Sequence, residues 1–224
     1  MLVSLERFFK QAFLDNEKQV AAAALSTVYH FSLENAEAVR RWSSEISQYL
    51  STGNTSSQCQ YLALGILFSI KQNDRIALTK MFQQISLNSN PSALLLLLRI
   101  YAFMMQLKPP VSGFSPIDLK PYLRFKSKND IVAVEAARVM CELHWLYERD
   151  LVVGVTTLQN FLTSGNSVIR FSAIKILNSL ANKNPAAVSG CNVEIESLLS
   201  DTNRTVATLA VTTLLKVISA VFSS

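Results

Sequence analysis

The side chains of this sequence best suited to binding a transition metal are two histidines and three cysteines, and the cysteines could also act as nucleophiles. Such sites need their groups at short, regular spacings. His30 and His144 stand at no metal-ligand spacing from a Cys, Asp or Glu. Cys59, Cys141 and Cys191 lie far apart and form no C-x-x-C pair, which is typical of buried, reduced thiols. We therefore predict no metal site and no cofactor.

The sequence also lacks the common catalytic and phosphate-binding motifs, and its carboxylates form no cluster. The sequence contains no glycine-rich phosphate loop, no G-x-S-x-G elbow and no H-E-x-x-H motif. Its glutamates are spread along the chain as expected of solvated or ion-paired helix surfaces, for example at Glu135, Glu142, Glu194 and Glu196. An enzyme is thus the least favoured alternative, and we expect no small-molecule substrate.

The composition predicts a folded helical protein. Half of the 224 residues are hydrophobic, 17% are charged, and there are only six Gly and six Pro. A chain this apolar is not disordered, and few breakers favour helix over sheet. The formal net charge is +5, and the basic residues are interspersed with acidic ones along the chain instead of forming one block. Nucleic acid is therefore not an expected partner.

Neither of the two most apolar segments reads as a membrane or export signal. Glu6 and Arg7 interrupt the apolar N-terminus, which excludes the core of a signal peptide. Arg99 interrupts the run 92–107, which is also too short to span a bilayer. We expect a soluble, cytosolic protein.

The sequence contains an internal repeat. In each repeat a polar residue is followed, seven positions later, by a small residue within a predicted apolar helix. The pairs are Asn16 and Ala23, Ser56 and Ala63, Asn129 and Ala136, Asn166 and Ala173, and Asn203 and Ala210. They recur about every 37–40 residues, with one double gap that holds a further unit around 90–103. This period predicts an all-α, right-handed α-α superhelix of the HEAT/armadillo type, with about 12 helices in six antiparallel pairs.

Helix boundaries follow from capping residues. Asn90-Pro91, Ser115-Pro116 and Asn184-Pro185 each combine an N-cap with a proline at the first helical position. Asp74, Asp130, Asp150 and Asn203 offer similar starts. The expected helices are 2–14, 17–32, 35–51, 55–71, 74–87, 91–107, 116–126, 130–147, 150–164, 167–183, 186–200 and 203–221. We treat 1–224 as a single domain, with 108–115 as an irregular loop inside it.

Two surfaces are candidates for binding partners. Lys120, Arg124, Lys126 and Lys128 form a basic run that suits an acidic partner or anionic lipid, although a solvated helix face is the alternative. The other is the helix 17–32. If Val20, Ala24, Val28 and Phe31 face the core, then the outward residues are Lys18, Gln19, Ala22, Ser26 and Tyr29. Tyr29 is either an interface anchor or a side chain lying over the neighbouring helix.

Four strings resemble the adaptin-type trunk of the coatomer gamma subunit family. They are ALGILFSIKQNDRIALTKMF (63–82), VRRWSSE (39–45), VAVEAARVM (132–140) and NPAAVSGCNVEIESLLSDTNRTVATLAVTTLLK (184–216). The similarity extends over essentially the whole chain. It implies a structural subunit of the COPI vesicle coat, in Golgi-to-endoplasmic-reticulum and intra-Golgi transport, peripheral on Golgi membranes and vesicles. A trunk segment of a clathrin-adaptor large subunit, or another HEAT-repeat scaffold, is the alternative.

The resemblance also implies partners. The family's trunk pairs with the zeta subunit, assembles with the beta and delta subunits, and binds a GTP-loaded Arf-family GTPase; we expect the GTPase contact on helix 17–32. Apolar residues crowd both ends of the chain, from Leu2 to Phe9 and from Leu214 to Phe222. Since terminal repeats normally carry polar caps, we expect a middle section of a longer trunk, with ends that promote self-association.

Overall fold

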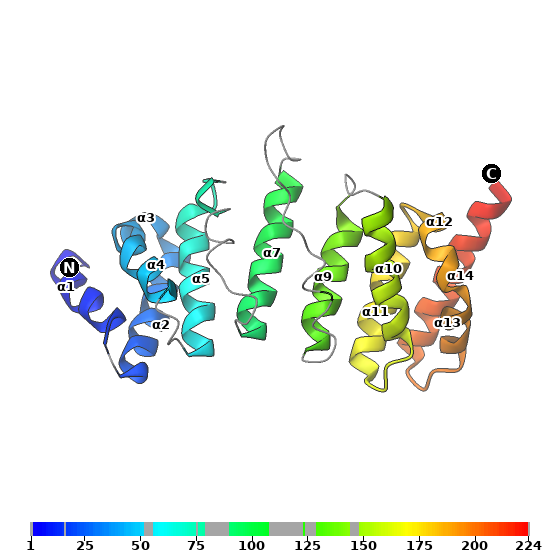
Figure 1. Cartoon of the computed structure of the whole chain (residues 1–224), viewed down its shortest axis with the longest axis horizontal. Helices are drawn as coiled ribbons and strands as arrows, with labels where there is room; N and C mark the ends of the chain where they lie inside the picture. Colours follow the sequence, from blue (N-terminus) through cyan, green and yellow to red (C-terminus); the bar gives the residue numbers. More distant parts are fainter. Residues whose placement is uncertain are drawn as a thin grey trace. The chain divides into compact units, whose positions relative to one another are not determined.

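The computed structural model describes residues 2–15, 17–51, 56–74, 76–78, 90–107, 123, 129–143 and 148–223, and within these residues all regular structure is helical (Figure 1). The first elements are α1 (Leu2–Phe13), α2 (Lys18–Glu34), α3 (Ala36–Val39), η1 (Arg40–Trp42), α4 (Ser43–Ser51), α5 (Ser57–Lys71) and α7 (Pro91–Leu107). The others are α9 (Asp130–Glu142), α10 (Glu148–Leu162), α11 (Ser167–Ala181), α12 (Pro185–Val188), η3 (Ser189–Cys191), α13 (Asn192–Ser197), η4 (Leu198–Ser200) and α14 (Arg204–Ser223). The all-α prediction is confirmed.

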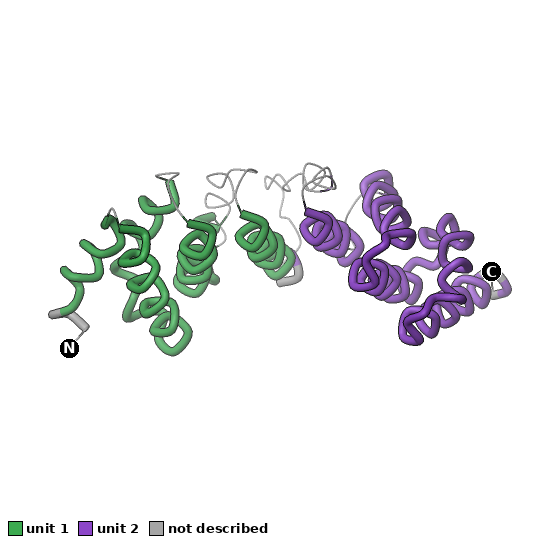
Figure 2. The backbone as a smooth tube through the Cα atoms, turned by 90° about the horizontal axis from the view of Figure 1, so that it is seen from below, with its two compact units in different colours: residues 1–104 green, residues 105–224 purple. Residues whose placement is uncertain are grey.

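The chain divides into two compact units, residues 1–104 and 105–224 (Figure 2). In each unit a helix contacts the helices next to it in the chain and the corresponding helix of the adjacent pair. This pattern of neighbour contacts is that of an α-solenoid, in which each repeat packs only against adjacent repeats. The expected helices 74–87 and 116–126 lie largely outside the described residues, so the total of twelve helices in six pairs stays a prediction.

Helix α2 lies at the centre of the first unit, because it contacts α1, α3 and α5. Its buried side chains are Ala21, Ala24, Leu25, Val28 and Ser32. In helix α5 every residue from Leu62 to Leu67 is buried. It reaches α7 through an edge-to-face pair of Phe68 and Phe103, whose ring centroids are 5.6 Å apart.

In the second unit α11 takes the central place, in contact with α9, α10 and α14. The contact between α11 and α14 includes a polar cluster. Asn178 Nδ2 donates to the hydroxyls of Thr212 and Thr213, both at 2.9 Å, and Lys216 Nζ donates to Asn178 Oδ1 at 2.8 Å. These bonds fix the register of α14 on α11, because half-buried polar groups need their partners at set positions.

Predicted caps are found where asparagine or serine precedes a helix. Asn90 Oδ1 accepts a bond from Ser92 N, Asn184 Oδ1 from Ala187 N and Asn203 Oδ1 from Thr205 N. Ser56 and Asn166 accept from the amides of Cys59 and Val168. Each bond satisfies a backbone amide that the helix leaves without an internal partner. Asp150 is not a cap, because α10 begins two residues earlier, at Glu148.

We predicted one continuous helix over 35–51 and another over 186–200, and both predictions were wrong. The segments 35–51 and 184–200 each contain two α-helices joined by a 3-10 turn. Each begins with a capping Asn and a four-residue α-helix, passes through a 3-10 turn and resumes as α-helix. Val39 and Val188 have ψ of −5° and −21°, which tightens the following turn. Identical residues at matched positions are Asn35 and Asn184, Ala38 and Ala187, Val39 and Val188, Glu45 and Glu194, Ile46 and Ile195, Leu50 and Leu199, and Ser51 and Ser200.

Small residues sit in the second helix of each pair, as the repeat predicted, but α2 departs by one position. Ala63, Ala136, Ala173 and Ala210 are fully buried. Ala23 is exposed. The N-cap of α2 is Glu17, and the residue seven positions after it, Ala24, is buried. The pairing of Asn16 with Ala23 was therefore wrong by one residue.

Replacing Ala173 by leucine should lower the free energy of unfolding by about 1–3 kcal/mol, because the larger side chain overpacks a site with no free surface. The same holds for Ala210→Leu. Urea unfolding followed by circular dichroism measures the loss. Ala186→Leu is the matched control, since Ala186 is exposed on α12. Equal stability of all three variants and the unchanged protein would contradict the packing.

Candidate protein-binding surface

The outward side of α2 carries the residues predicted for it. Lys18 and Gln19 are exposed, and Ala22 and Ser26 are half-buried. Of the four residues expected in the core, Ala24 and Val28 are buried, but Val20 and Phe31 are exposed and that part of the prediction was wrong. The buried stripe runs through Ala21, Leu25, Val28 and Ser32 at helical steps of four, three and four residues, so Val20 and Phe31 each lie one residue before it.

Tyr29 lies over the neighbouring helix instead of projecting into solvent. A Cβ placed on Gly65 of α5 would stand 2.5 Å from Tyr29 Cε2, so the ring occupies the space that any other side chain at position 65 would take. Of the two alternatives for Tyr29, packing on the adjacent helix is the one observed. The half-buried Tyr29 ring thus packs between α2 and α5.

Tyr61 is an exposed aromatic residue that the sequence analysis missed. It lies one turn before Gly65 on α5, and 37% of its surface is exposed. It follows the cap Ser56 by five positions, as Ala22 follows the cap Glu17, so both project from the same side of their helices. The repeat register places it there once α2 is counted from Glu17 instead of Asn16. We call Lys18, Gln19, Ala22, Ser26, Tyr29 and Tyr61 the α2–α5 surface.

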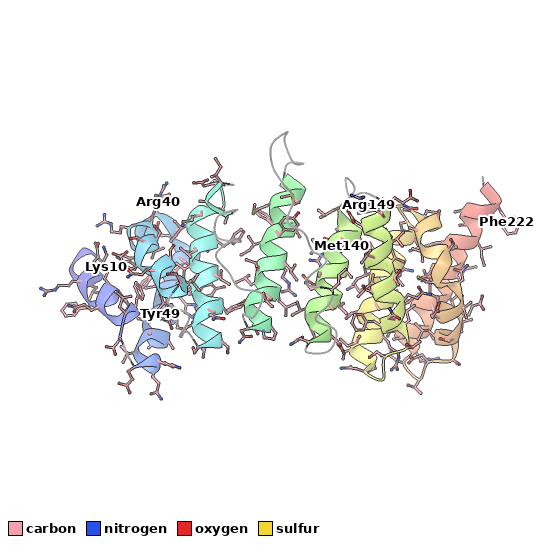
Figure 3. All side chains as sticks on the ribbon, viewed as in Figure 1. Lys10, Arg40, Tyr49, Met140, Arg149 and Phe222 are labelled. Atoms are coloured by element: carbon pink, nitrogen blue, oxygen red, sulfur yellow. The ribbon has the colours of Figure 1, made fainter. Side chains whose placement is uncertain are left out.

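A cluster of ion pairs in this unit joins α1 to η1 and α4. Lys10 Nζ lies 3.2 Å from a carboxylate oxygen of Glu6 and 2.8 Å from one of Glu45, and Arg41 bonds to Glu6 at 3.2 Å. These hydrogen bonds, that from Lys10 first, hold the pKa of Glu6 below its usual value. Figure 3 marks Lys10 on α1 and Arg40 beside α3. Of the residues that make up the α2–α5 surface, Lys18 alone is charged.

The sequence matches the model of the adaptin N terminal region over residues 1–221. The chain belongs to the adaptin N-terminal family. Among its relatives are the coatomer gamma subunits of Arabidopsis thaliana (38% identical over 223 residues, 96% of this chain) and Dictyostelium discoideum (39% over 219 residues, 97%). Human coatomer subunit gamma-1 is 34% identical over 218 residues, or 96% of this chain. The predicted resemblance to coatomer gamma is confirmed.

This adaptin-family chain corresponds to only part of those relatives. The matched regions make up 25%, 24% and 25% of the Arabidopsis, Dictyostelium and human proteins. The chain thus spans about a quarter of the length of the curated relatives it matches. What the remaining three quarters of those proteins do cannot be transferred to it from this similarity.

The sequence of this adaptin-family chain also singled out a basic run and two histidines. Lys120, Arg124, Lys126 and Lys128 lie outside the described residues, as does His144, so the basic run stays a prediction. Within the described part of the chain, no three His, Cys, Asp or Glu side chains come together as metal ligands. No helix among the described elements has the length and apolarity to cross a bilayer.

All three cysteines are buried and free. Burial raises the pKa of Cys141 to about 12 and that of Cys191 to about 11, well above the ordinary thiol value. We expect the folded protein at about pH 8 to react with a chromogenic disulfide reagent at least about a hundredfold more slowly than the urea-unfolded chain, because little thiolate is present and access is blocked. A thiol that reacts at the unfolded rate in the folded protein would contradict this placement.

Proposed function

We propose that the chain is a structural, adaptor-type segment of a COPI coat subunit, and that it works by binding other proteins. One observation carries the proposal: similarity to coatomer gamma subunits extends over 96–97% of the chain without being confined to one motif. A stack of helix pairs suits such a role, because each pair adds a rigid surface at a fixed place. The three relatives named above favour coatomer over a clathrin-adaptor trunk.

The proposed partners are the other coatomer subunits (zeta, beta and delta) and a GTP-bound Arf-family GTPase. The proposed location is cytoplasmic, peripheral on Golgi membranes and coated vesicles. Recruitment would follow an order-and-shape switch. GTP orders the switch loops of the GTPase, and a preformed helical surface binds the ordered form.

The α2–α5 surface is the proposed GTPase contact. It is built on two packed helices, Lys18 is its one charged residue, and Tyr61 provides an exposed aromatic ring amid small side chains. Aromatic residues of this kind contribute a large share of binding energy at protein interfaces. Tyr29, which also belongs to this surface, packs against Gly65 and so holds α2 and α5 together beneath the exposed residues.

Tyr61→Ala is expected to weaken binding of the GTP-loaded GTPase by about 2 kcal/mol, or about thirtyfold in Kd. Titration calorimetry with GTP- and GDP-loaded Arf measures the effect. Val152→Ala on α10 is the matched control, because Val152 is an exposed apolar residue of the other unit. Equal binding by Tyr61→Ala would remove this surface from the proposal.

A pull-down with the zeta subunit and with GTP-locked Arf tests the function itself. Capture of either partner supports a COPI trunk segment. Binding to neither would leave a helical scaffold without the proposed role.

A further inference from the structure

The elements α1 to α4 and α10 to α13 are matching parts of the two units. The N-caps Glu17 and Asn166 lie 149 positions apart in the sequence, and so do the N-caps Asn35 and Asn184. The identical residues of the two broken segments have the same separation. Each side chain of the first part therefore has a counterpart 149 positions later.

In the first unit, four charged side chains form a balanced cluster. Lys10 Nζ lies 2.8 Å from a carboxylate oxygen of Glu45 and 3.2 Å from one of Glu6, and Arg41 lies 3.2 Å from Glu6. Two positive charges thus meet two negative ones. Glu6, Lys10 and Glu45 also line a surface pocket of about 710 Å³, so the cluster borders solvent.

The matching place in the second unit carries one negative charge and no positive one. The counterparts of Glu6, Lys10, Arg41 and Glu45 are Val155, Gln159, Gly190 and Glu194, in that order. Gln159 Nε2 donates to the carbonyl of Gly190, at 3.3 Å. Glu194 Oε2 is buried, and no described residue donates a hydrogen bond to it. Because a carboxylate oxygen withdrawn from water is unfavourable without a partner, this place favours a cation.

The second unit also has room for an added side chain here. A Cβ placed on Gly190 would meet no atom within 4 Å, so the space that begins with the Arg41 side chain in the first unit is open. Gly190 is exposed and Glu194 as a whole is half-buried, so the place borders solvent. Val193, the neighbour of Glu194 in α13, is 75% exposed and offers an apolar contact beside the charge.

We propose that Gln159, Gly190 and Glu194 form a site, the Glu194 site, for a lysine or arginine side chain of a partner protein. The incoming cation pairs with the Glu194 carboxylate as Lys10 pairs with Glu45, and Gln159 moves aside from the Gly190 carbonyl, which becomes a second acceptor. Val193 favours a protein over a free amine, because it gives the partner an apolar contact next to its charge.

The Glu194 site is independent of the proposed function. It lies between α10 and α13 in the second unit, whereas the proposed GTPase contact lies on α2 and α5 in the first. Loss of GTPase binding would leave the Glu194 site unaffected, and the converse also holds.

Titration of the 15N-labelled chain with butylammonium and with ethylguanidinium, the end groups of lysine and arginine, tests the site by NMR. We expect saturable shifts of the Gly190 and Glu194 amides, and the probe that binds more tightly identifies the preferred side chain. Glu194→Gln should weaken binding at least about tenfold in Kd, because the charge is lost. Glu196→Gln is the matched control, since Glu196 is an exposed glutamate of the same helix, and it should bind as the unchanged protein does.

Gln159→Lys tests the site from inside the chain. Lysine at this position has the place that Lys10 has beside Glu45, so it should pair with Glu194, raise the midpoint of urea unfolding and prevent binding of both probes. The proposal is overturned if neither probe gives saturable shifts at Gly190 and Glu194, or if Glu194→Gln binds them as well as Glu196→Gln. An unchanged or lower unfolding midpoint for Gln159→Lys, together with unchanged probe binding, would also overturn it.

Discussion

Replacing Trp42 by alanine is expected to lower the free energy of unfolding by about 3–5 kcal/mol, the largest loss for a single buried side chain in the first unit. Trp42 is almost fully buried in η1. Its ring centroid lies 5.3 Å from that of Phe9 and 6.4 Å from that of Phe13, so it joins α1 to the segment that follows α3. Alanine would remove these contacts and leave a cavity that the short 3-10 turn cannot close.

Trp42→Phe separates the ring contacts from the indole nitrogen. Among the described residues, no atom accepts a hydrogen bond from Trp42 Nε1, which is buried. Phenylalanine keeps an aromatic ring and removes this unpaired donor, so we expect it to cost about 1 kcal/mol. Urea unfolding measures both variants, and hydrogen exchange should show faster opening in α1–α5 than in α10–α14. If the Trp42→Ala and Trp42→Phe proteins had equal free energies of unfolding, the proposed stabilising role of the Trp42 ring contacts with Phe9 and Phe13 would be contradicted.

Local rules predicted helices well where the cap and the apolar pattern agreed. The helix expected at 91–107 is α7, Pro91–Leu107, because Asn90 caps it and proline occupies its first position. Such features depend only on residues within one turn of each other. They are therefore readable from the sequence without knowledge of the fold.

Errors arose where a residue outside the helix decided the outcome. Asn16 resembles a cap, but the N-cap of α2 is Glu17, and the buried stripe runs through Ala21, Leu25, Val28 and Ser32. The position of Tyr29 depends on Gly65, 36 residues away in sequence, which opens space for the ring. No periodicity within α2 carries that information. The repeat register aligns Tyr61 with Ala22 only when α2 is counted from Glu17, which the structure provides.

Arg170→Met is expected to destabilise the second unit by about 3 kcal/mol, at the low end of the cost of breaking a buried ion pair. Arg170 Nε donates to Asp201 Oδ2 at 2.7 Å, and its Nη1 donates to the carbonyl of Ser164 at 2.8 Å. The Asp201 side chain is only 5% exposed. The arginine thus ties the turn before α11 to the turn before α14, and methionine would leave the carboxylate without this charged partner.

Arg40→Met is the matched control for Arg170→Met. Arg40 pairs with Glu37 three residues before it, but both side chains are mostly exposed. Exposed pairs contribute little, so this variant should unfold at nearly the same urea concentration as the unchanged protein. Equal losses for the two arginines would show that burial does not distinguish them.

The pH dependence of the pair follows from Asp201. The hydrogen bond from Arg170, with a second from the amide of Asn203, lowers the pKa of Asp201 below its usual value. A lowered carboxyl pKa contributes stability above the pKa of the unfolded chain, about 3.9, and loses it as the pH falls through the folded value. The difference in unfolding free energy between the unchanged protein and Asp201→Asn should therefore stay constant from neutral pH to about pH 5 and shrink below about pH 4. A difference that persists in acid would mean that Asp201 acts through its shape and not its charge.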